Sequence, residues 1–504
     1  MQEFSHHSAH QSPTRFTHFI RFGCCRVALV IAALLFTTVS AVAKQPPPPE
    51  WLNSAVVYCV YPQIFSTHGF QGVTAQLDRL HRLGANVIWL MPITPMGQAT
   101  PNHPAFGSPY AVQDYYAVNP DYGSEADLKE LVRTAHGLGM KVLLDEVLNH
   151  TSWDNQLTIR HPEFYRHSDN NPHDPGSEQV AFTFNDVVQL DYRFPHSGLW
   201  TYMDEMLKYW INTYDVDGFR FDTANNPPGL ERMINQDFWL HLRTVLKAAK
   251  PDVLLLGEEE DTSLALAPFE LDYGWNLQSA VQQVANGTRK ASDLQGVWKK
   301  QTSGWPAGTM HLSLIQNWDL DADFKIYGGT LNTMDVATLN FTLNGVPLLF
   351  NGEEVGNDQS GNNTHKPIHW DAPQAQAFTR FYTDLLALRN ANPALQQGAV
   401  SWESNSAPAQ VVSYLRSNGT TEFLIEINFS SKAVQGTVNV PAGRPWTDVS
   451  PSGSPSGRNH VQPGVLELQP HDFAVFERST AGANSGLQQA QDARSTTAAN
   501  SGQR

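Results

Sequence analysis

The scarcity of cysteine excludes more classes of protein than any other feature of the composition. The 504-residue chain has three cysteines, and Cys24 and Cys25 lie in an N-terminal segment that we expect to be removed. Cys59 would then be alone in the mature chain, so no internal disulfide can form. The sequence also contains no Cys/His spacing typical of zinc sites, no glycine-rich phosphate loop and no dinucleotide-binding fingerprint. Disulfide scaffolds, common zinc enzymes and nucleotide-dependent enzymes are therefore not predicted.

Positive charge is also scarce. Lys and Arg number 33 against 49 Asp and Glu, which gives a formal net charge of -16. An acidic surface of this kind disfavours nucleic acids and anionic membranes as partners. It is compatible with a neutral substrate such as a sugar.

The N-terminal segment has the pattern of an export signal. Three arginines precede a charge-free run from Val27 to Ala43, which ends in AVA at the small-residue spacing of a cleavage site. We predict a signal peptide over residues 1–43 and hence a periplasmic or secreted protein. The alternative, an uncleaved anchor, is disfavoured because the run is short for a membrane span and contains hydroxyl residues. After cleavage we expect no membrane contact.

Two further segments are predicted to lie outside the fold. Residues 44–50 are proline-rich and predict a stiff spacer, whereas residues 479–504 are rich in Ser, Ala, Gln and Gly and predict a disordered tail.

The region between them alternates strand-like and helix-like segments. Short apolar runs bounded by polar turns predict eight buried strands. Their centres lie near Tyr58, Ile88, Leu143, Phe219, Leu255, Tyr273, Ile315 and Leu348. Amphipathic stretches such as residues 125–139 and 198–214 predict the intervening helices. We therefore predict an α/β fold, a (β/α)8 TIM barrel over residues 51–393, in which the strand near Tyr273 has the weakest pattern.

Two segments depart from the βα alternation. Residues 151–196, after the third strand, are rich in Asn, His and Pro and too long for an ordinary loop, so they predict a small inserted domain. After the helical stretch 378–393 the pattern changes to short alternating runs separated by Gly, Ser and Pro turns. This change predicts a C-terminal antiparallel β-sandwich over residues 394–478.

Charged side chains end four of the predicted strands. They are Asp145, Arg220 with Asp222, Glu258 and Asp319. A βα barrel builds its active site at the C-terminal ends of its strands. Four carboxylates and an arginine that converge there indicate glycosidic chemistry.

Arg220 and Asp222 lie two residues apart, so on a strand their side chains share one face. We expect the guanidinium to lower the pKa of Asp222 and hold it as an anion, which suits a nucleophile. The alternative is a structural ion pair at the barrel rim.

Glu258 is followed by three more acidic residues, Glu259, Glu260 and Asp261. Crowding of like charges raises at least one carboxyl pKa, so an acid that keeps its proton near neutral pH is expected here. Glu260 stays an alternative to Glu258 because it shares the strand face, whereas Glu259 and Asp261 are expected to be solvated or supporting groups.

The motifs together resemble those of α-amylase-type enzymes of glycoside hydrolase family 13. The resemblance runs from Trp51 to Arg478 and includes GANVIWLMPITPMG, KVLLDEVLNH, GFRFD, LLLGEE, LIQNWD and NGVPLLFNGEE in the family's order. It implies a barrel, an inserted B domain after strand three, a C-terminal β domain, and retaining chemistry on α-glucosidic bonds. It also implies roles for the three carboxylates: Asp222 as nucleophile, Glu258 as general acid/base and Asp319 as support for the transition state.

The resemblance implies substrate contacts as well. Tyr110 in SPYAVQDYY matches an aromatic platform for the sugar at subsite -1, and His150 matches a histidine that donates to a hydroxyl of that sugar. Asp145 would brace Arg220.

Two positions depart from the family pattern. Trp318 replaces the histidine of the usual Asn-His-Asp, and an indole can donate one hydrogen bond but cannot accept one. Trp318 either alters the contacts at subsite -1 or forms a hydrophobic wall. Asn225 and Asn226 stand where many amylases have Lys and His, so the acceptor side differs from that of a standard starch-degrading enzyme.

No cofactor is expected to be required for the chemistry, but structural calcium is an open question. Calcium-binding family members use the Asn that matches Asn149, a B-domain Asp and the backbone near Asn226. Gln189 stands where that Asp is expected, and Asp191 or Asp186 could substitute as an oxygen ligand.

Three functions from different classes remain open. The first is hydrolysis of α-glucosidic bonds in maltooligosaccharides or starch-like α-glucans. The second, indicated by Trp318 and Asn225, is glycosyl transfer or isomerisation on short α-glucosides. The third is glycan binding without turnover, which the presence of every catalytic carboxylate disfavours.

Overall fold

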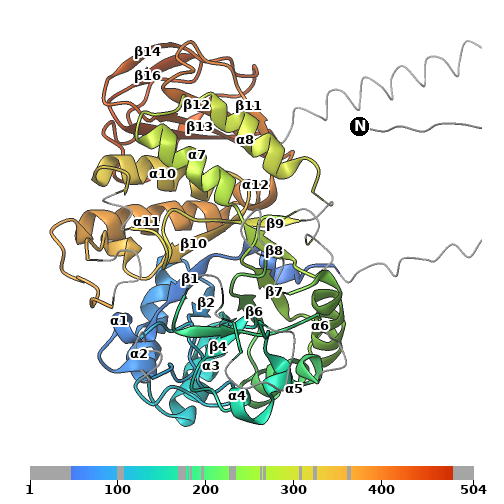
Figure 1. Cartoon of the computed structure of the whole chain (residues 1–504). Coiled ribbons are helices and arrows are strands. Elements are labelled where there is room, and N and C mark those ends of the chain that lie inside the picture. The colour runs from blue at the N-terminus through green and yellow to red at the C-terminus, as the bar shows by residue number, and fades with distance from the viewer. Residues whose placement is uncertain are drawn as a thin grey trace, which may run out of the picture. The chain divides into compact units, whose positions relative to one another are not determined.

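Eight parallel strands close into a barrel in the computed structural model of this chain (Figure 1). They are β1 (Val57–Val60), β2 (Val87–Leu90), β3 (Lys141–Glu146), β6 (Gly218–Phe221), β7 (Leu254–Gly257), β8 (Leu271–Tyr273), β9 (Met310–Ser313) and β10 (Val346–Phe350). Each strand pairs with its neighbour along the chain in this set, and β10 closes the barrel on β1. The predicted (β/α)8 barrel is confirmed.

The structure describes residues 47–98, 107–168, 177–179, 181, 184–193, 198–225, 234–261, 264, 268–305, 309–321, 326–359 and 365–480. The predicted signal peptide therefore lies outside the described residues, as does nearly all of the predicted tail. Within the described ranges, no helix combines the length and the apolar character that a membrane crossing requires.

Helices connect successive strands. Those with described bounds are α1 (Pro62–Phe65), α2 (Gly69–Leu83), α3 (Glu125–Gly137), α5 (Leu199–Tyr214), α6 (Gln236–Ala249), α7 (Trp275–Ala285), α8 (Asp293–Thr302), α10 (Thr330–Thr342), α11 (Ala375–Ala391) and α12 (Pro393–Gln397), with 3-10 turns η1 (Glu50–Ser54) and η3 (Glu353–Val355). Local sequence sets where α3 begins, because Ser124 and Asp127 form a capping box at its start. The helices predicted over 125–139 and 198–214 are α3 and α5.

Burial on both faces explains why the barrel strands read as continuous apolar runs. The weakly predicted strand near Tyr273 is β8, and its internal acid, Asp272, is buried because its carboxylate bonds to His311 Nδ1 of β9. Strand β9 itself ends earlier than the predicted centre at Ile315. Its ladder stops where Ser313 pairs with Pro347, which has no N–H to donate.

The inserted segment after β3 begins with a strand pair. Strand β4 (His150–Ser152) runs antiparallel to β5 (Val187–Gln189), and α4 (Leu157–Arg160) and η2 (Pro162–Phe164) lie between them in sequence. Several parts of the predicted insertion, among them residues 169–176 and 194–197, lie outside the described residues.

The C-terminal region forms two antiparallel sheets, which confirms the predicted sandwich. One sheet has the order β11-β12-β13-β17-β15 and the other consists of β14 and β16. Their bounds are β11 (Ala399–Trp402), β12 (Val411–Ser417), β13 (Thr421–Asn428), β14 (Val434–Thr437), β15 (Thr447–Asp448), β16 (Val465–Leu468) and β17 (Asp472–Ser479).

Two buried arginines bind main-chain carbonyl groups near the junction of this sheet with the barrel, and Arg416 connects the two directly. Arg416 of β12 donates through Nη1 to the carbonyl oxygen of Thr342, at the end of α10, at 2.5 Å. Arg389 of α11 donates to the carbonyl oxygens of Leu395 at 2.7 Å and Gly345 at 2.9 Å. Burial lowers the pKa of Arg389 to about 9 and that of Arg416 to about 10. Both guanidiniums thus satisfy main-chain carbonyl groups that a helix end leaves unpaired.

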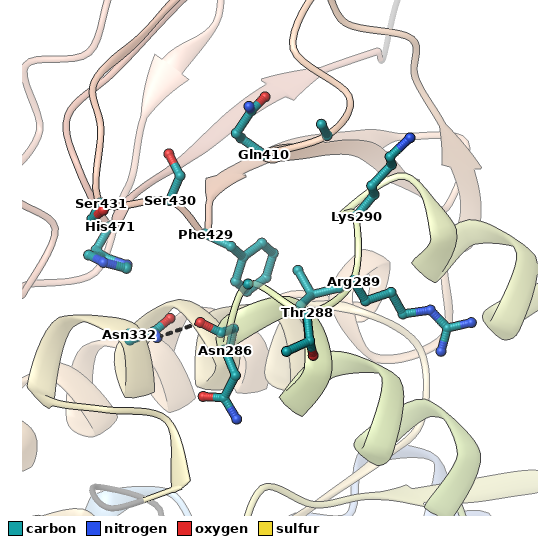
Figure 2. Close-up of a pocket in the computed structure, with 14 residues that line it drawn as sticks. Asn286, Thr288, Arg289, Lys290, Asn332, Gln410, Phe429, Ser430, Ser431 and His471 are labelled. Carbon is teal, nitrogen blue, oxygen red and sulfur yellow. Dashed lines mark hydrogen bonds between the residues drawn. The ribbon is translucent and has the colours of Figure 1, made fainter.

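The same junction contains a cavity of about 560 Å³ (Figure 2). Phe429 and Gln410 line it from the C-terminal sheet region and Asn286 from the end of α7, while Asn332 of α10 donates to the carbonyl oxygen of Ala285 at 2.9 Å. None of the predicted catalytic or substrate-binding residues lines this cavity.

Candidate active site

Strand register brings the predicted charged residues together. Asp145 on β3 pairs directly with Arg220 on β6, and Phe221 pairs with Gly257 at the end of β7. Asp222 and Glu258 follow these last two residues, so they leave adjacent strands at the same level.

Arg220 is the centre of the cluster. Its Nη1 lies 2.8 Å from Asp145 Oδ1 and 3.2 Å from Asp222 Oδ1, and its Nη2 lies 2.6 Å from Glu258 Oε2. One buried guanidinium therefore contacts three carboxylates. The predicted pairing of Asp145 with Arg220 is present, and the two predicted catalytic carboxylates share one cation.

Three aromatic rings enclose this guanidinium. Its carbon lies 5.3 Å from the ring centre of Trp89, 5.6 Å from that of Tyr110 and 5.8 Å from that of Tyr273. Trp89 Nε1 and the Tyr110 hydroxyl each donate to Asp145 Oδ2 at 3.2 Å, and Arg220 Nε donates to the Tyr273 hydroxyl at 3.3 Å. The sequence reasoning missed Trp89 and Tyr273. Each is an aromatic residue on a predicted barrel strand, and alternate side chains of such a strand point into the barrel, so the sequence could have indicated both.

The expectation that Arg220 lowers the pKa of Asp222 needs correction. Burial raises the pKa of Asp222 above the ordinary aspartate value, and Arg220 only opposes this rise. Asn149 Nδ2 and the Thr223 hydroxyl each donate to Asp222 Oδ2 at 3.3 Å, which also favours the anion. The sequence identified the correct partner but not the desolvation, which is the larger effect.

The pKa of Glu258 is raised, as expected, but the acids that follow it in the sequence are not the cause. Burial is the largest cause and the neighbouring Asp222 adds to it, whereas Arg220 opposes both. The backbone N–H of Thr223 donates to Glu258 Oε2 at 2.8 Å and fixes the carboxylate. A carboxyl group whose pKa is raised keeps a proton nearer to neutral pH, as a general acid must.

The acids after Glu258 differ from one another. Glu259 is buried rather than solvated, and burial together with Asp272 raises its pKa to about 9. Glu260 Oε2 instead accepts from the backbone N–H of Asn276 at 2.7 Å. Among the three acids Glu258, Glu259 and Glu260, only Glu258 has an ion pair with Arg220.

Asp319 lies beyond β9 and is exposed to solvent. Its pKa is raised to about 6, mainly by burial of its surroundings and by the charge of Glu258. Asn317 holds the residue in place: Nδ2 donates to Asp319 Oδ2 at 3.3 Å, and Oδ1 accepts from the Asp319 N–H at 3.1 Å. Asp319 therefore belongs electrostatically to the cluster while remaining accessible.

His150 contradicts one expectation. Its Nε2 lies 3.0 Å from the carbonyl oxygen of Tyr110, which can only accept, so Nε2 carries the proton. Burial lowers the pKa of His150 to about 4 and keeps the ring neutral. The remaining nitrogen, Nδ1, is buried without a hydrogen-bond partner among the described residues and can accept but not donate. A sugar hydroxyl that meets His150 would donate to it.

Trp318 is almost fully buried and packs as a wall. Its ring meets Tyr61 edge-on at 5.0 Å and His365 edge-on at 5.6 Å between ring centres. The ring of Trp318 therefore forms a hydrophobic wall, while its indole N–H has no hydrogen-bond partner among the described residues. His365, from the segment after β10, was not anticipated from the sequence.

On the expected acceptor side, Asn225 is already engaged. Its Nδ2 donates to Asp261 Oδ2 at 2.9 Å, which ties the segment after β6 to the segment after β7. Asn226 lies outside the described residues.

The residues expected to bind calcium do not fit that ion well. Asn149 Oδ1 is a buried oxygen without a hydrogen-bond partner in the described chain, as a calcium ligand would be. The carboxylate of Asp191, however, receives Arg193 Nε at 2.9 and 3.1 Å and Arg193 Nη2 at 2.6 Å. The guanidinium supplies the positive charge that a cation would bring. The described residues also contain no group of three or more His, Cys, Asp or Glu arranged to hold a metal.

We therefore expect chelation with EDTA to leave thermal stability and activity essentially unchanged. Arg193→Ala should lower the free energy of unfolding by about 1–2 kcal/mol, since Asp191 is buried and Arg193 only partly exposed. In that variant added Ca²⁺ should restore stability if Asp191 and Asn149 can bind it. The measurement is thermal unfolding of both proteins with EDTA and with Ca²⁺; a large EDTA effect on the unchanged protein would contradict the expectation.

Comparisons with known proteins agree with this geometry. The model of the α-amylase catalytic domain matches residues 60–404. A cyclomaltodextrinase of a Bacillus species is 26% identical over 433 residues, which cover 76% of this chain and 74% of the relative. Neopullulanase 2 of Thermoactinomyces vulgaris is 24% identical over 450 residues, covering 79% and 74%. The crystal structure of an α-amylase from Lactobacillus plantarum superposes with a TM-score of 0.72 at 25% identity, covering 85% of this chain and 99% of that one.

The barrel, the strand-end carboxylates and these matches define a carbohydrate-active hydrolase of the βα-barrel class. The chain belongs to the α-amylase family.

Proposed function

We propose that this protein is a retaining α-glycosidase that hydrolyses α-glucosidic bonds in maltooligosaccharides or starch-like α-glucans. The observation that carries the proposal is the single guanidinium of Arg220, which holds Asp145, Asp222 and Glu258 together at the C-terminal ends of β3, β6 and β7. Two carboxyl groups kept side by side by one cation suit double displacement, which requires them to be close.

In the first step Asp222 attacks the anomeric carbon of the bound glucosyl unit while Glu258 protonates the departing glycosidic oxygen. The glucosyl unit becomes covalently bound to Asp222, and the leaving sugar departs as an alcohol. In the second step Glu258, now ionised, removes a proton from water, and the water oxygen displaces Asp222. Two inversions at the anomeric carbon leave the product with the α configuration of the substrate.

The other residues of the cluster support these steps. Arg220 stabilises the carboxylate form of Asp222 against the desolvation that raises its pKa. Asp145 accepts three hydrogen bonds, from Arg220, Trp89 and Tyr110, and so fixes the guanidinium and the predicted aromatic platform. Asp319 is accessible and lies close enough to Glu258 for that charge to raise its pKa. Its carboxylate can accept hydrogen bonds from hydroxyls of the distorted sugar.

A second candidate is glycosyl transfer to a sugar acceptor. The observation that favours it is the engagement of Asn225 by Asp261, which gives the acceptor side a different polar surface from the Lys and His of many amylases. An acceptor sugar bound there would compete with water for the glucosyl unit on Asp222.

One experiment separates these functions. The mature protein is incubated with starch, maltoheptaose, maltose, trehalose and sucrose, and the products are identified by chromatography and their anomers by NMR. Shorter products with initial α configuration support hydrolysis, and products longer than the substrate support transfer. Inertness toward all five would contradict both proposals.

The location of the protein is a further part of the proposal. We infer export, on the strength of the basic, apolar and AVA pattern over residues 1–43. An intracellular maltogenic amylase of Bacillus subtilis is among the relatives, so family membership alone does not decide the compartment. We expect the exported chain to begin at Lys44. Mass spectrometry of the N-terminal peptide measures this, and an intact N-terminus at Met1 on the mature protein would contradict it.

A further inference from the structure

His365 takes a place beside the cluster that its sequence position does not indicate. Its ring lies edge-on to Trp318, at 5.6 Å, and to Tyr61, at 5.8 Å, and its Nδ1 lies 3.1 Å from the Tyr61 hydroxyl oxygen. Trp318 immediately precedes Asp319, and Tyr61 immediately follows β1. The imidazole of His365 therefore packs on two aromatic rings that lie, like the cluster, beyond the C-terminal ends of barrel strands.

The hydrogen bonds of Tyr61 determine which nitrogen of His365 carries the proton. The Tyr61 hydroxyl lies 2.5 Å from Gln63 Oε1, an amide oxygen that can only accept. The single hydroxyl proton is therefore donated to Gln63, and the hydroxyl oxygen accepts from His365 Nδ1–H. In a neutral imidazole this leaves a lone pair on Nε2. Partial desolvation beside the two rings lowers the pKa of His365, which favours the neutral form.

This Nε2 is available to a ligand. The His365 side chain is exposed, and Nε2 has no hydrogen-bond or ion-pair partner in the described parts of the chain. His369, four residues later in the same segment, differs: Nδ1 lies 3.1 Å from Asp358 and Nε2 3.4 Å from Asp371. Of these two histidines, only His365 has a ring nitrogen that can accept a hydrogen bond and has no partner among the described residues.

Trp318 adds the complementary group. Its indole N–H donates to no residue in the described ranges, and it is not among the fully enclosed unpaired atoms there. An acceptor on His365 and a donor on Trp318, on rings 5.6 Å apart, match the hydroxyl groups on neighbouring carbons of a pyranose, each of which can both donate and accept.

We propose that His365, mounted on Trp318 and Tyr61, binds a hydroxyl group of the α-glucosyl substrate through Nε2 and so supplies an imidazole in place of the motif histidine that Trp318 replaces. The assignment rests on the proposed α-glycosidase function and names one sugar-binding subsite for it. His365 is a binding residue, and Tyr61 and Gln63 are positioning residues that fix its tautomer.

The test compares four variants with the unchanged protein: His365→Ala, His365→Asn, His365→Gln and the matched control His369→Ala. The kinetic readout is kcat and KM for maltotriose and maltoheptaose. A readout independent of turnover is calorimetric binding of maltotriose to the same variants carrying Asp222→Asn. Circular dichroism and thermal unfolding check that each variant folds.

Loss of one neutral hydrogen bond to the substrate should lower kcat/KM of His365→Ala about 10-fold and weaken maltotriose binding by a similar factor. His365→Asn keeps a donor for Tyr61 but lacks the Nε2 acceptor, so it should behave like His365→Ala. His365→Gln places an amide oxygen near the Nε2 position and should recover most of the loss. His369→Ala should equal the unchanged protein.

Two kinds of failure are distinguishable. If the unchanged protein neither binds nor cleaves any α-glucoside, the proposed function and this assignment fall together. If the unchanged protein is active but His365→Ala matches His369→Ala in kcat/KM and binding, the assignment of His365 alone is overturned. A loss in His365→Asn with no recovery in His365→Gln would also overturn it, because the lost contact would then not be an accepted hydrogen bond.

Discussion

Asp222→Asn should reduce kcat on maltoheptaose by at least about 10⁴-fold, because an amide cannot act as the nucleophile that attacks the anomeric carbon. The variant should fold normally. Asparagine has nearly the shape of aspartate, and Arg220 keeps its ion pairs with Asp145 and Glu258. Binding of maltotriose should persist, so the loss should appear in kcat rather than in affinity.

The matched control is Asp321→Asn, which removes an exposed carboxylate two residues beyond Asp319. Its kcat should equal that of the unchanged protein. Mass spectrometry of rapidly quenched reactions should detect a hexosyl adduct on the Asp222 peptide of the unchanged protein and none in Asp222→Asn. Substantial turnover by Asp222→Asn would refute the assignment of the nucleophile.

The second large effect concerns the proton donor. Glu258→Gln should lower kcat/KM on maltotriose by about 10³-fold, within the range expected for loss of general acid catalysis. The loss should be far smaller for the first step with α-glucosyl fluoride, whose leaving group needs no proton. Burial and Asp222 raise the pKa of Glu258, so in the unchanged protein the acid form persists to higher pH than in a free glutamate. In Glu258→Gln the alkaline limb of the pH profile should disappear.

Glu260→Gln is the variant to compare with Glu258→Gln, since Glu260 is the alternative general acid. Its carboxylate already accepts from the Asn276 backbone and has no ion pair with Arg220 in the described structure. We expect its kcat/KM on maltotriose to stay within about 3-fold of the unchanged protein. A 10³-fold loss in Glu260→Gln together with an active Glu258→Gln would transfer the acid role to Glu260.

The positions of the barrel strands were predictable because these strands are buried on both faces and leave an apolar signature in the sequence. The exception is instructive. Asp272 weakens the pattern of β8, and its burial depends on His311, which lies 39 residues away. A partner at that separation leaves no local signal. The same holds for the early end of β9, which depends on Pro347 in the neighbouring strand.

The composition of the site was predictable from its motifs, but its energetics were not. Arg220 was expected beside Asp222, yet the direction of the pKa shift depends on desolvation, which only the packed structure reveals. The proton position on His150 depends on a carbonyl 40 residues away. The pairing of Asp191 with Arg193, by contrast, spans two residues and could have been considered from the sequence.

Arg416 makes the completion of α10 depend on a later part of the chain. The carbonyl group of Thr342, at the end of α10, finds its donor on a residue synthesised 74 positions later. Until Arg416 has been synthesised and has packed, this carbonyl group lacks its native donor, so the last turn of α10 should remain hydrated or frayed even when the barrel strands are complete. A truncated chain that ends at Gln397 should therefore be more sensitive to protease around α10 than the full chain.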